Sequence, residues 1–230
     1  MKITIDKAQK IIDLFTNMNS KKDFLTLLNI SKNFIYKENT LPFTEKQLNY
    51  YLIKDSKKFN SKRKSYTEFT INKKSGGLRT INAPIKGLKE FQKALNLVLQ
   101  SVHEPHKNAT GFIQERSIID NASAHVGQNY VYNIDLKDFF PSIDASRVWG
   151  RLLHPPFNLK STPERKHIAN MIKTLCCTEL EVERYKDGEW KKEKKLVLPQ
   201  GAPTSPTLTN AICDKLDRRL TGVAKRFGLN

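Results

Sequence analysis

Two segments of the sequence most constrain what this chain can fold into. In the first, the apolar run Tyr130-Val-Tyr-Asn-Ile134 leads directly into Asp135 and then into Phe139 and Phe140. In the second, Leu198-Pro-Gln-Gly201 forms a glycine turn before a long stretch of helical periodicity. An apolar strand that ends in a carboxylate, and a glycine turn that opens a helix, together predict an α+β fold.

The composition fits a folded, nucleic-acid-binding protein. The chain has 230 residues, of which 38% are hydrophobic, so it can bury the core of one large domain or two small ones. Forty basic residues against 23 acidic residues give a net charge of +17, which favours a polyanionic partner. A generally lysine-rich composition is the ordinary explanation of part of that charge. The three cysteines lack Cys-x-x-Cys spacing, so neither a zinc site nor a disulfide framework is expected.

The sequence predicts neither export nor membrane insertion. The start, Met1-Lys-Ile-Thr-Ile-Asp6, lacks the apolar core of a signal peptide, and no apolar run approaches membrane-spanning length. Unpaired cysteines are typical of a reducing compartment. We therefore expect a cytoplasmic protein without a membrane partner.

Apolar periodicity predicts helices on both sides of two hairpins. Helices are expected over 45–53, 145–154 and 163–177, after Pro84, and from about Thr204 onward. Thr44 is the expected N-cap of the first of these. Hairpins are expected over 66–83 and 180–198, and residues 130–135 are expected to form a short buried strand. On the last helix, one face is expected to carry Leu208, Ile212, Leu216, Leu220 and Val223.

Asp135 is the candidate catalytic and metal-binding residue. Nucleotidyl transfer uses two divalent ions roughly 3.5–4 Å apart, and hard ions prefer carboxylate and carbonyl oxygens. A strand end would hold the Asp135 carboxylate rigidly, and the main-chain carbonyl of Leu136 would supply a further ligand. The alternative role, capping of the following helix, fits Asp138 and Asp144 better than Asp135.

Two phenylalanines and the glycine turn are candidates for contacts with a nucleotide. A bulky ring beneath the sugar would collide with a 2′-hydroxyl, and we expect Phe140 to be that ring and Phe139 to pack. Gln200 can hydrogen-bond a base, sugar or phosphate, and Gly201 permits close approach of a ligand. Ordinary core packing and a simple loop-to-helix junction are the alternatives.

The turn of the first expected hairpin is basic. Lys73, Lys74 and Arg79 surround the glycines of Lys73-Lys-Ser-Gly-Gly-Leu-Arg79. Cations beside a glycine turn can neutralise a triphosphate, and arginine suits bidentate phosphate contact. A solvated charged turn is the alternative.

Taken in order, these segments resemble those of bacterial reverse transcriptases. The resemblance covers about residues 65–230 and includes Lys74-Ser-Gly-Gly-Leu-Arg79 with Ala83-Pro84, Thr110-Gly-Phe-Ile-Gln-Glu-Arg-Ser-Ile118, Ile134-Asp135 through Pro141-Ser-Ile143, and Leu198-Pro-Gln-Gly-x-x-x-Ser-Pro206. Asn121-Ala-Ser-Ala-His125 is similar to an element of retron reverse transcriptases. An exposed helix with one satisfied histidine would explain that element equally well, so group II intron and defence-associated enzymes remain alternatives.

The resemblance implies a role for each matching residue. Asp135, with the Leu136 carbonyl, would bind Mg²⁺ or Mn²⁺. The nucleotide-binding residues would be Lys73, Lys74, Arg79, Phe139, Phe140 and Gln200. The template would contact Arg116, Gly201 and Pro203. The implied partners are an RNA template, a primer and deoxynucleoside triphosphates, and the oligomeric state is left open.

The implied fold is the right-hand polymerase fold of reverse transcriptases. Fingers would span 1–110, including the hairpin 66–83, and 144–202, whereas the palm would span 111–143 and 203–230. These 230 residues contain no Tyr-x-Asp-Asp sequence after the last expected helix, where the resemblance would place the strand with further metal-binding aspartates, and we expect the thumb to be absent from them. We therefore expect an N-terminal fragment of a retron-like RNA-directed DNA polymerase, inactive alone. The alternative is a catalytically silent, basic RNA-binding module.

Overall fold

The computed structural model of the chain describes residues 3–37, 40–53, 65–73 and 76–229. Its elements are α1 (Ile5–Asn17), α2 (Lys21–Tyr36), α3 (Glu45–Leu52), β1 (Tyr66–Asn72), β2 (Leu78–Pro84), α4 (Lys86–Val102), α5 (Ile118–Ser123), α6 (Ala145–Leu153), α7 (Pro163–Cys176), β3 (Thr178–Lys186), β4 (Glu189–Val197) and α8 (Ser205–Arg226). The predicted helices and both predicted hairpins are confirmed, with ends that differ by no more than two residues. The mixed composition of helices and strands fits the expected α+β class.

Side-chain caps explain where several helices begin. The Ser20 hydroxyl accepts a hydrogen bond from the Asp23 amide, and the Asp23 carboxylate accepts one from the Ser20 amide, at the start of α2. Thr44 and Gln47 make the same reciprocal pair at the start of α3, which confirms Thr44 as an N-cap. Each pair satisfies amides that a helix end leaves without partners.

The core lies among the helices. Buried side chains of α1, α2, α4, α6, α7 and the first half of α8 form one apolar cluster. Within it, the Gln92 side chain of α4 donates to the Tyr66 hydroxyl of β1 and to the Leu175 carbonyl of α7, each at 2.7 Å. Burial raises the pKa of the Tyr66 hydroxyl, which therefore stays neutral. This network attaches the first hairpin to the helical body.

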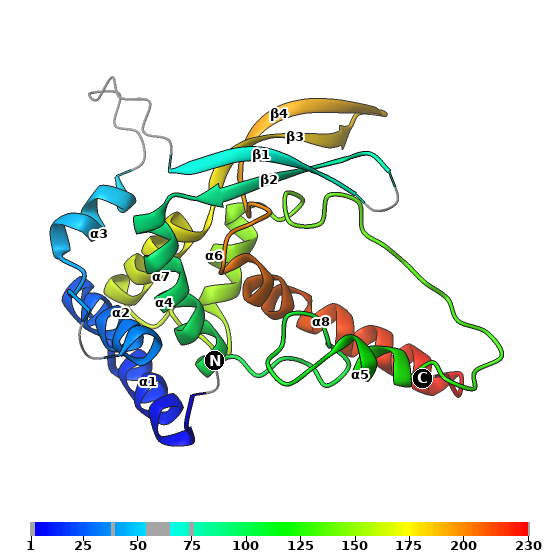
Figure 1. Cartoon of the computed structure of the whole chain (residues 1–230), viewed down its shortest axis with the longest axis horizontal. Coiled ribbons are helices and arrows are strands. Elements are labelled where there is room, and N and C mark those ends of the chain that lie inside the picture. Colours follow the sequence, from blue (N-terminus) through cyan, green and yellow to red (C-terminus); the bar gives the residue numbers. More distant parts are fainter. Residues whose placement is uncertain (1–2, 38–39, 54–64, 74–75, 230) are drawn as a thin grey trace.

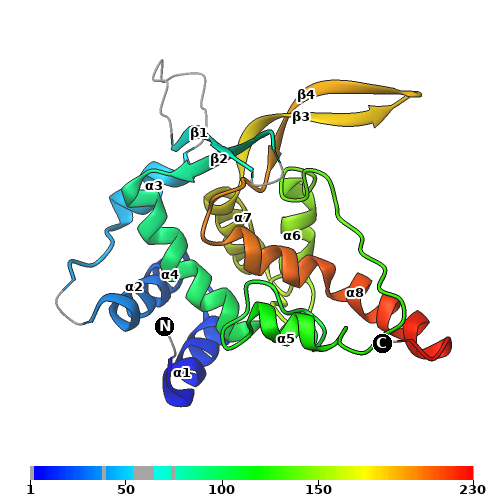
Figure 2. The same ribbon diagram turned by 45° about the vertical axis from the view of Figure 1, so that its right-hand side comes forward.

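The two hairpins lie next to each other over one end of the helical body (Figure 1). Each is a separate antiparallel pair, with Arg79 opposite Ile71 in β1–β2 and Trp190 opposite Tyr185 in β3–β4. Figures 1 and 2 agree that the first residues of β2 lie beside the short turn that precedes α6. This corner of the molecule brings together most of the segments singled out by the sequence.

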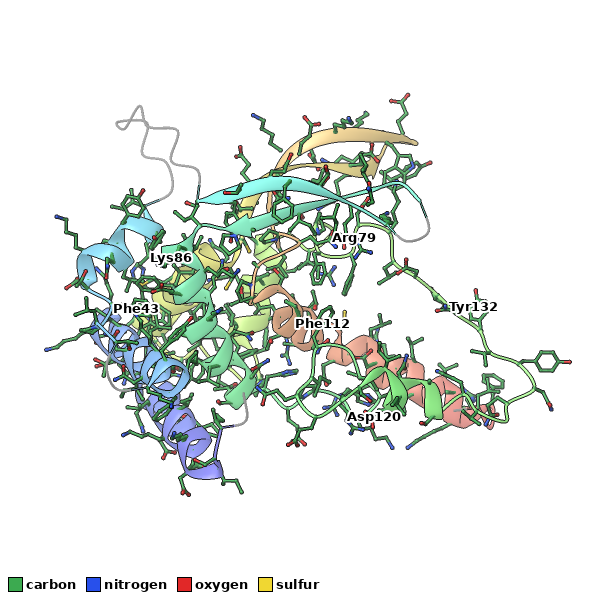
Figure 3. The ribbon with its side chains drawn as sticks, viewed as in Figure 1. Phe43, Arg79, Lys86, Phe112, Asp120 and Tyr132 are labelled. Carbon is green, nitrogen blue, oxygen red and sulfur yellow. The ribbon has the colours of Figure 1, made fainter. Side chains whose placement is uncertain are left out.

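The predicted strand at residues 130–135 is wrong. The segment is an extended coil, in which Tyr130 is 95% exposed and Tyr132 is 88% exposed. Figure 3 shows Tyr132 on a stretch of chain that passes well outside the helical body. An apolar strand is stable only when a neighbouring strand satisfies its backbone groups, and no strand of the described chain pairs with this segment.

The apolar face expected on α8 is only half buried. Leu208 is fully buried and Ile212 packs against the core, but Leu216, Leu220 and Val223 are about half exposed. The outer half of α8 extends beyond the body of the other helices (Figure 2), where the Asn108 side-chain amide donates to the Thr221 hydroxyl at 3.0 Å. None of the helices in the described ranges combines the length and the apolar character needed to cross a membrane.

Candidate nucleotide site

A tight turn after Asp135 is the centre of the candidate site. The Ser142 amide donates to the Asp138 carbonyl at 2.9 Å, and the Ile143 amide donates to the Phe140 carbonyl at 3.0 Å. Asp138 has a left-handed backbone, with φ of +50°, which aspartate tolerates better than most residues. The turn, residues 138–142, therefore has a defined geometry, in contrast to the coil that precedes it.

The two phenylalanines of this turn point to different neighbours. Phe139 packs against the hydrophobic core, as predicted. Phe140 is partly exposed, and its ring lies edge-on to that of Phe112, with the ring centroids 6.3 Å apart. Phe112 belongs to the segment Thr110–Ile118, which the sequence singled out for Arg116 and not for this contact. Phe140 is thus held by a second motif while part of its ring remains accessible.

The turn at Gln200 and Gly201 lies against β2. The Asn82 amide donates to the Gln200 carbonyl at 2.7 Å. Gly201 has φ of +120°, and a β-carbon there would come within 2.8 Å of the Ile81 side chain and 3.0 Å of the Asn82 carbonyl oxygen. The strand β2 therefore makes one close approach to Gly201, which is otherwise exposed. Pro203, two residues later, is partly buried at the start of α8.

The basic residues of the first hairpin are exposed at its turn end. Lys73 and Arg79 are both exposed, and Gly76 and Gly77 have φ values of +85° and +83°. The Lys73 amide donates to the Gly77 carbonyl and closes the turn. Lys74, the other predicted triphosphate contact, lies outside the described residues. Figure 3 shows Arg79 on β2 close to the corner that contains the 138–142 turn.

The segment with Arg116 lies farther out. Arg116 is exposed just before α5, and Ser117 and Asp120 form the capping pair that begins this helix. Hydrogen bonds from Ser117 lower the pKa of the Asp120 carboxyl, so this cap is charged at neutral pH. Asn121 and His125 are exposed on and just after α5.

Asp135 is exposed, and the described residues do not complete a metal site around it. No group of three or more histidine, cysteine, aspartate or glutamate side chains in the described ranges is arranged to hold an ion. Asp135 and the Leu136 carbonyl supply oxygen ligands of the right chemistry, but a two-ion site needs further carboxylates. The described part of the chain therefore does not fit a complete magnesium site by itself.

Residues outside the predicted site contact the 138–142 turn and the residues on either side of it. Arg184 of β3 donates to the Pro141 carbonyl and to the Asp144 carboxylate, each at 2.8 Å. Asp144 occupies the N-cap position of α6, as predicted, but its side chain makes no capping hydrogen bond. Lys137 lies 3.6 Å from the Glu183 carboxylate. One signal in the sequence pointed to Arg184: it alternates with Leu180 and Val182 on the inward face of a predicted strand.

Replacing Gly201 with alanine is expected to lower the free energy of unfolding by about 2–4 kcal/mol, because backbone strain and a clash with β2 act together. Gly188 is the matched control, since it has φ of +84° but open space around it. Its replacement with alanine should cost only about 1 kcal/mol. Urea unfolding of both variants measures the difference, and equal losses would contradict the close packing of Gly201 on β2.

Comparison with known proteins identifies the relatives of this chain. Residues 71–227 match the family described as reverse transcriptase (RNA-dependent DNA polymerase). The chain is 41% identical over 166 residues to the Retron Mx162 reverse transcriptase of Myxococcus xanthus, with 71% of this chain and 33% of that relative covered. It is 36% identical over 169 residues to the Retron Ec86 reverse transcriptase of Escherichia coli, with 71% and 45% covered.

The matched residues include every motif on which the resemblance was based. The chain spans less than half the length of these curated relatives. The family to which these motifs were assigned is thereby confirmed: the chain belongs to the reverse transcriptase family, with retron reverse transcriptases among its relatives.

Proposed function

We propose that this chain forms the nucleotide- and template-binding part of a retron-type RNA-directed DNA polymerase. Family membership supports the reaction class, since reverse transcriptases copy RNA into DNA and use divalent metal ions. In this reaction the primer 3′-hydroxyl attacks the α-phosphate of a deoxynucleoside triphosphate, and pyrophosphate leaves. The proposed partners are an RNA template, a primer and deoxynucleoside triphosphates, and the proposed ion is Mg²⁺, acting in the bacterial cytoplasm.

One observation carries the proposal. Motifs that are far apart in the sequence contact one another at a single corner of the fold. Phe112 meets Phe140, and the Gln200 carbonyl accepts a hydrogen bond from Asn82 of β2, the strand that carries Arg79. These contacts support a site to which the basic hairpin, the aromatic turn and the glycine turn each contribute, for a triphosphate, a sugar and a template base.

In this proposal each group has one task. Lys73 and Arg79 bind the triphosphate, because exposed cations at a glycine turn can surround phosphate oxygens. Phe140 lies under the sugar, and Asp135 contributes one ion-binding carboxylate. Arg116, Gly201 and Pro203 contact the template strand. The fingers would comprise residues 1–110 and 144–202, and the palm 111–143 and 203–230.

Primer extension on an RNA template tests the reaction. The gene product that contains these residues is expected to extend a DNA primer with deoxynucleotides when Mg²⁺ is present, and to stop when the ion is chelated. The 230-residue chain alone is expected to give no extension, because its described residues supply too few carboxylates for two ions. A gene product that binds RNA but never extends a primer would support the silent RNA-binding module instead.

The basic hairpin gives a prediction about salt. Each phosphate that a cation neutralises adds about −0.7 to the slope of log K against log salt for single strands. The double replacement of Lys73 and Arg79 with alanine should therefore make the slope shallower by up to about 1.4 for two lost contacts. Lys192 and Lys194 of β4 provide a control pair with the same charge loss. Equal slopes for both double variants would contradict the hairpin contact.

A further inference from the structure

The hairpin β3–β4 is attached to both ends of the segment 137–144. At one end, the Lys137 ammonium lies 3.6 Å from the Glu183 carboxylate and 5.8 Å from the centroid of the Trp190 ring. At the other end, Arg184 donates to the Pro141 carbonyl and the Asp144 carboxylate, both at 2.8 Å. Glu183 and Arg184 are consecutive, so one short stretch of β3 contacts Lys137, Pro141 and Asp144, on both sides of Phe139 and Phe140.

The two attachments differ in strength. Lys137 and Glu183 have side chains that are 77% and 46% exposed, so solvent screens their attraction and it contributes little. The Arg184 and Asp144 side chains are only 22% and 33% exposed. A partly buried arginine that binds a carboxylate and a carbonyl with good geometry makes charge-assisted hydrogen bonds, which are the stronger kind. Arg184 is therefore the principal contact.

Backbone contacts join the end of this segment, but not the turn itself, to the β3–β4 hairpin. Asp144 forms an isolated bridge with Val197, and the Leu198 amide donates to the Ile143 carbonyl at 3.1 Å. These bonds join the start of α6 to the base of β4. Pro141 has no amide hydrogen and depends on its carbonyl for a polar contact outside the turn. Arg184 supplies that contact, and the carbonyl that it binds belongs to the residue directly after Phe140.

We propose that Arg184 is a positioning residue for the nucleotide site, which it sets by holding the 138–142 turn against the β3–β4 hairpin. The inference rests on the proposed function, because it gives Phe140 the place beneath the incoming sugar. Without Arg184, Asp144 loses its partner and the turn is free to shift relative to Phe112 and the basic hairpin. A misplacement of about 1 Å in a reacting assembly can cost on the order of a hundredfold in rate.

The test uses the gene product and separates nucleotide binding from turnover. Arg184→Ala is expected to raise KM for deoxynucleotides about tenfold and to weaken the preference for deoxy- over ribonucleotides, with a smaller change in kcat. Arg184→Lys should recover only part of the loss, because Arg184 binds both acceptors through Nη2 while Nη1 donates to the Glu183 carbonyl, and a lysine ammonium lacks the planar group that makes all three bonds. Lys192→Ala, on the neighbouring strand and exposed, is the matched control and should leave both quantities unchanged.

A second measurement does not depend on activity. In the 230-residue chain, Arg184→Ala should speed hydrogen exchange at the Ser142 and Ile143 amides, which close the turn, and leave the α7 amides protected. Unchanged exchange, or a variant whose KM and sugar preference equal those of Lys192→Ala, would overturn the inference. A lower melting temperature with unchanged KM and preference would assign Arg184 to stability alone and overturn it too. An inactive wild-type gene product would instead contradict the proposed function, and with it the catalytic meaning of Arg184.

Discussion

Replacing Asp135 with asparagine is expected to reduce RNA-templated primer extension by the gene product more than about 100-fold. Loss of a residue that merely orients a metal ligand already costs about 10–100-fold, and a ligand itself should cost more. Asparagine keeps the size of the side chain and removes its charge. Asp135 is exposed and makes no hydrogen bond or ion pair within the described ranges, so the melting temperature should not change.

Asp138→Asn is the matched control for this experiment. Asp138 is exposed, lies three residues away and loses the same charge, but it has no proposed contact with an ion. Extension by this variant should stay within about threefold of wild type, as for a charge change outside the site. If Asp135→Asn kept most of the activity, or if both variants lost it equally, the proposed role of Asp135 would be wrong.

Replacing Phe140 with alanine is expected to weaken discrimination against ribonucleotides by about tenfold or more. The proposed selection is steric, because the ring occupies the space that a 2′-hydroxyl would need. A difference of this size in a pocket changes the discrimination between two substrates by about 1–3 kcal/mol. Single-nucleotide incorporation with matched deoxy- and ribonucleotides gives the ratio of kcat/KM values. Because Phe140 is only partly buried and contacts Phe112 at its edge, a modest loss of stability is expected.

Phe139 provides the control within the same turn. Its ring packs against the hydrophobic core, so Phe139→Ala should lower the free energy of unfolding more than Phe140→Ala does. The fraction that folds should retain its preference for deoxynucleotides. Phe140→Ala should therefore change mainly the sugar preference, whereas Phe139→Ala should change mainly the stability. A change of sugar preference in Phe139→Ala alone would exchange the roles of the two residues.

Much of the fold could be predicted because its signals are local. Thr44 with Gln47 begins α3, apolar residues repeat along α4, and glycines mark the turns of both hairpins. Hydrogen bonds that close within a few residues depend on the sequence nearby. The strand expected at 130–135 shows the limit of this reasoning. Its residues suit a strand, but a strand needs a partner from elsewhere in the fold, and no strand of the described chain pairs with this segment.

In the site, too, residues within a local motif could be predicted, whereas contacts between distant segments could not. Motif residues such as Asp135, Phe140 and Gln200 could be identified from their order in the sequence. Arg184 could not, because its contact with Pro141 and Asp144 depends on how a hairpin crosses a turn 40 residues earlier. Gly201 was predicted to allow a close approach, but the sequence could not show that β2 makes one.

The account depends on Asp135, the basic hairpin and the glycine turn forming one site. Paramagnetic broadening by Mn²⁺ added with a deoxynucleoside triphosphate to the isotope-labelled 230-residue chain tests this most directly. The account predicts that the amides of Arg79, Leu136 and Gln200 broaden together, and that Asp135→Asn reduces the broadening while Asp138→Asn does not. Broadening at the glutamates of the β3–β4 hairpin, with those three amides unaffected, would contradict it.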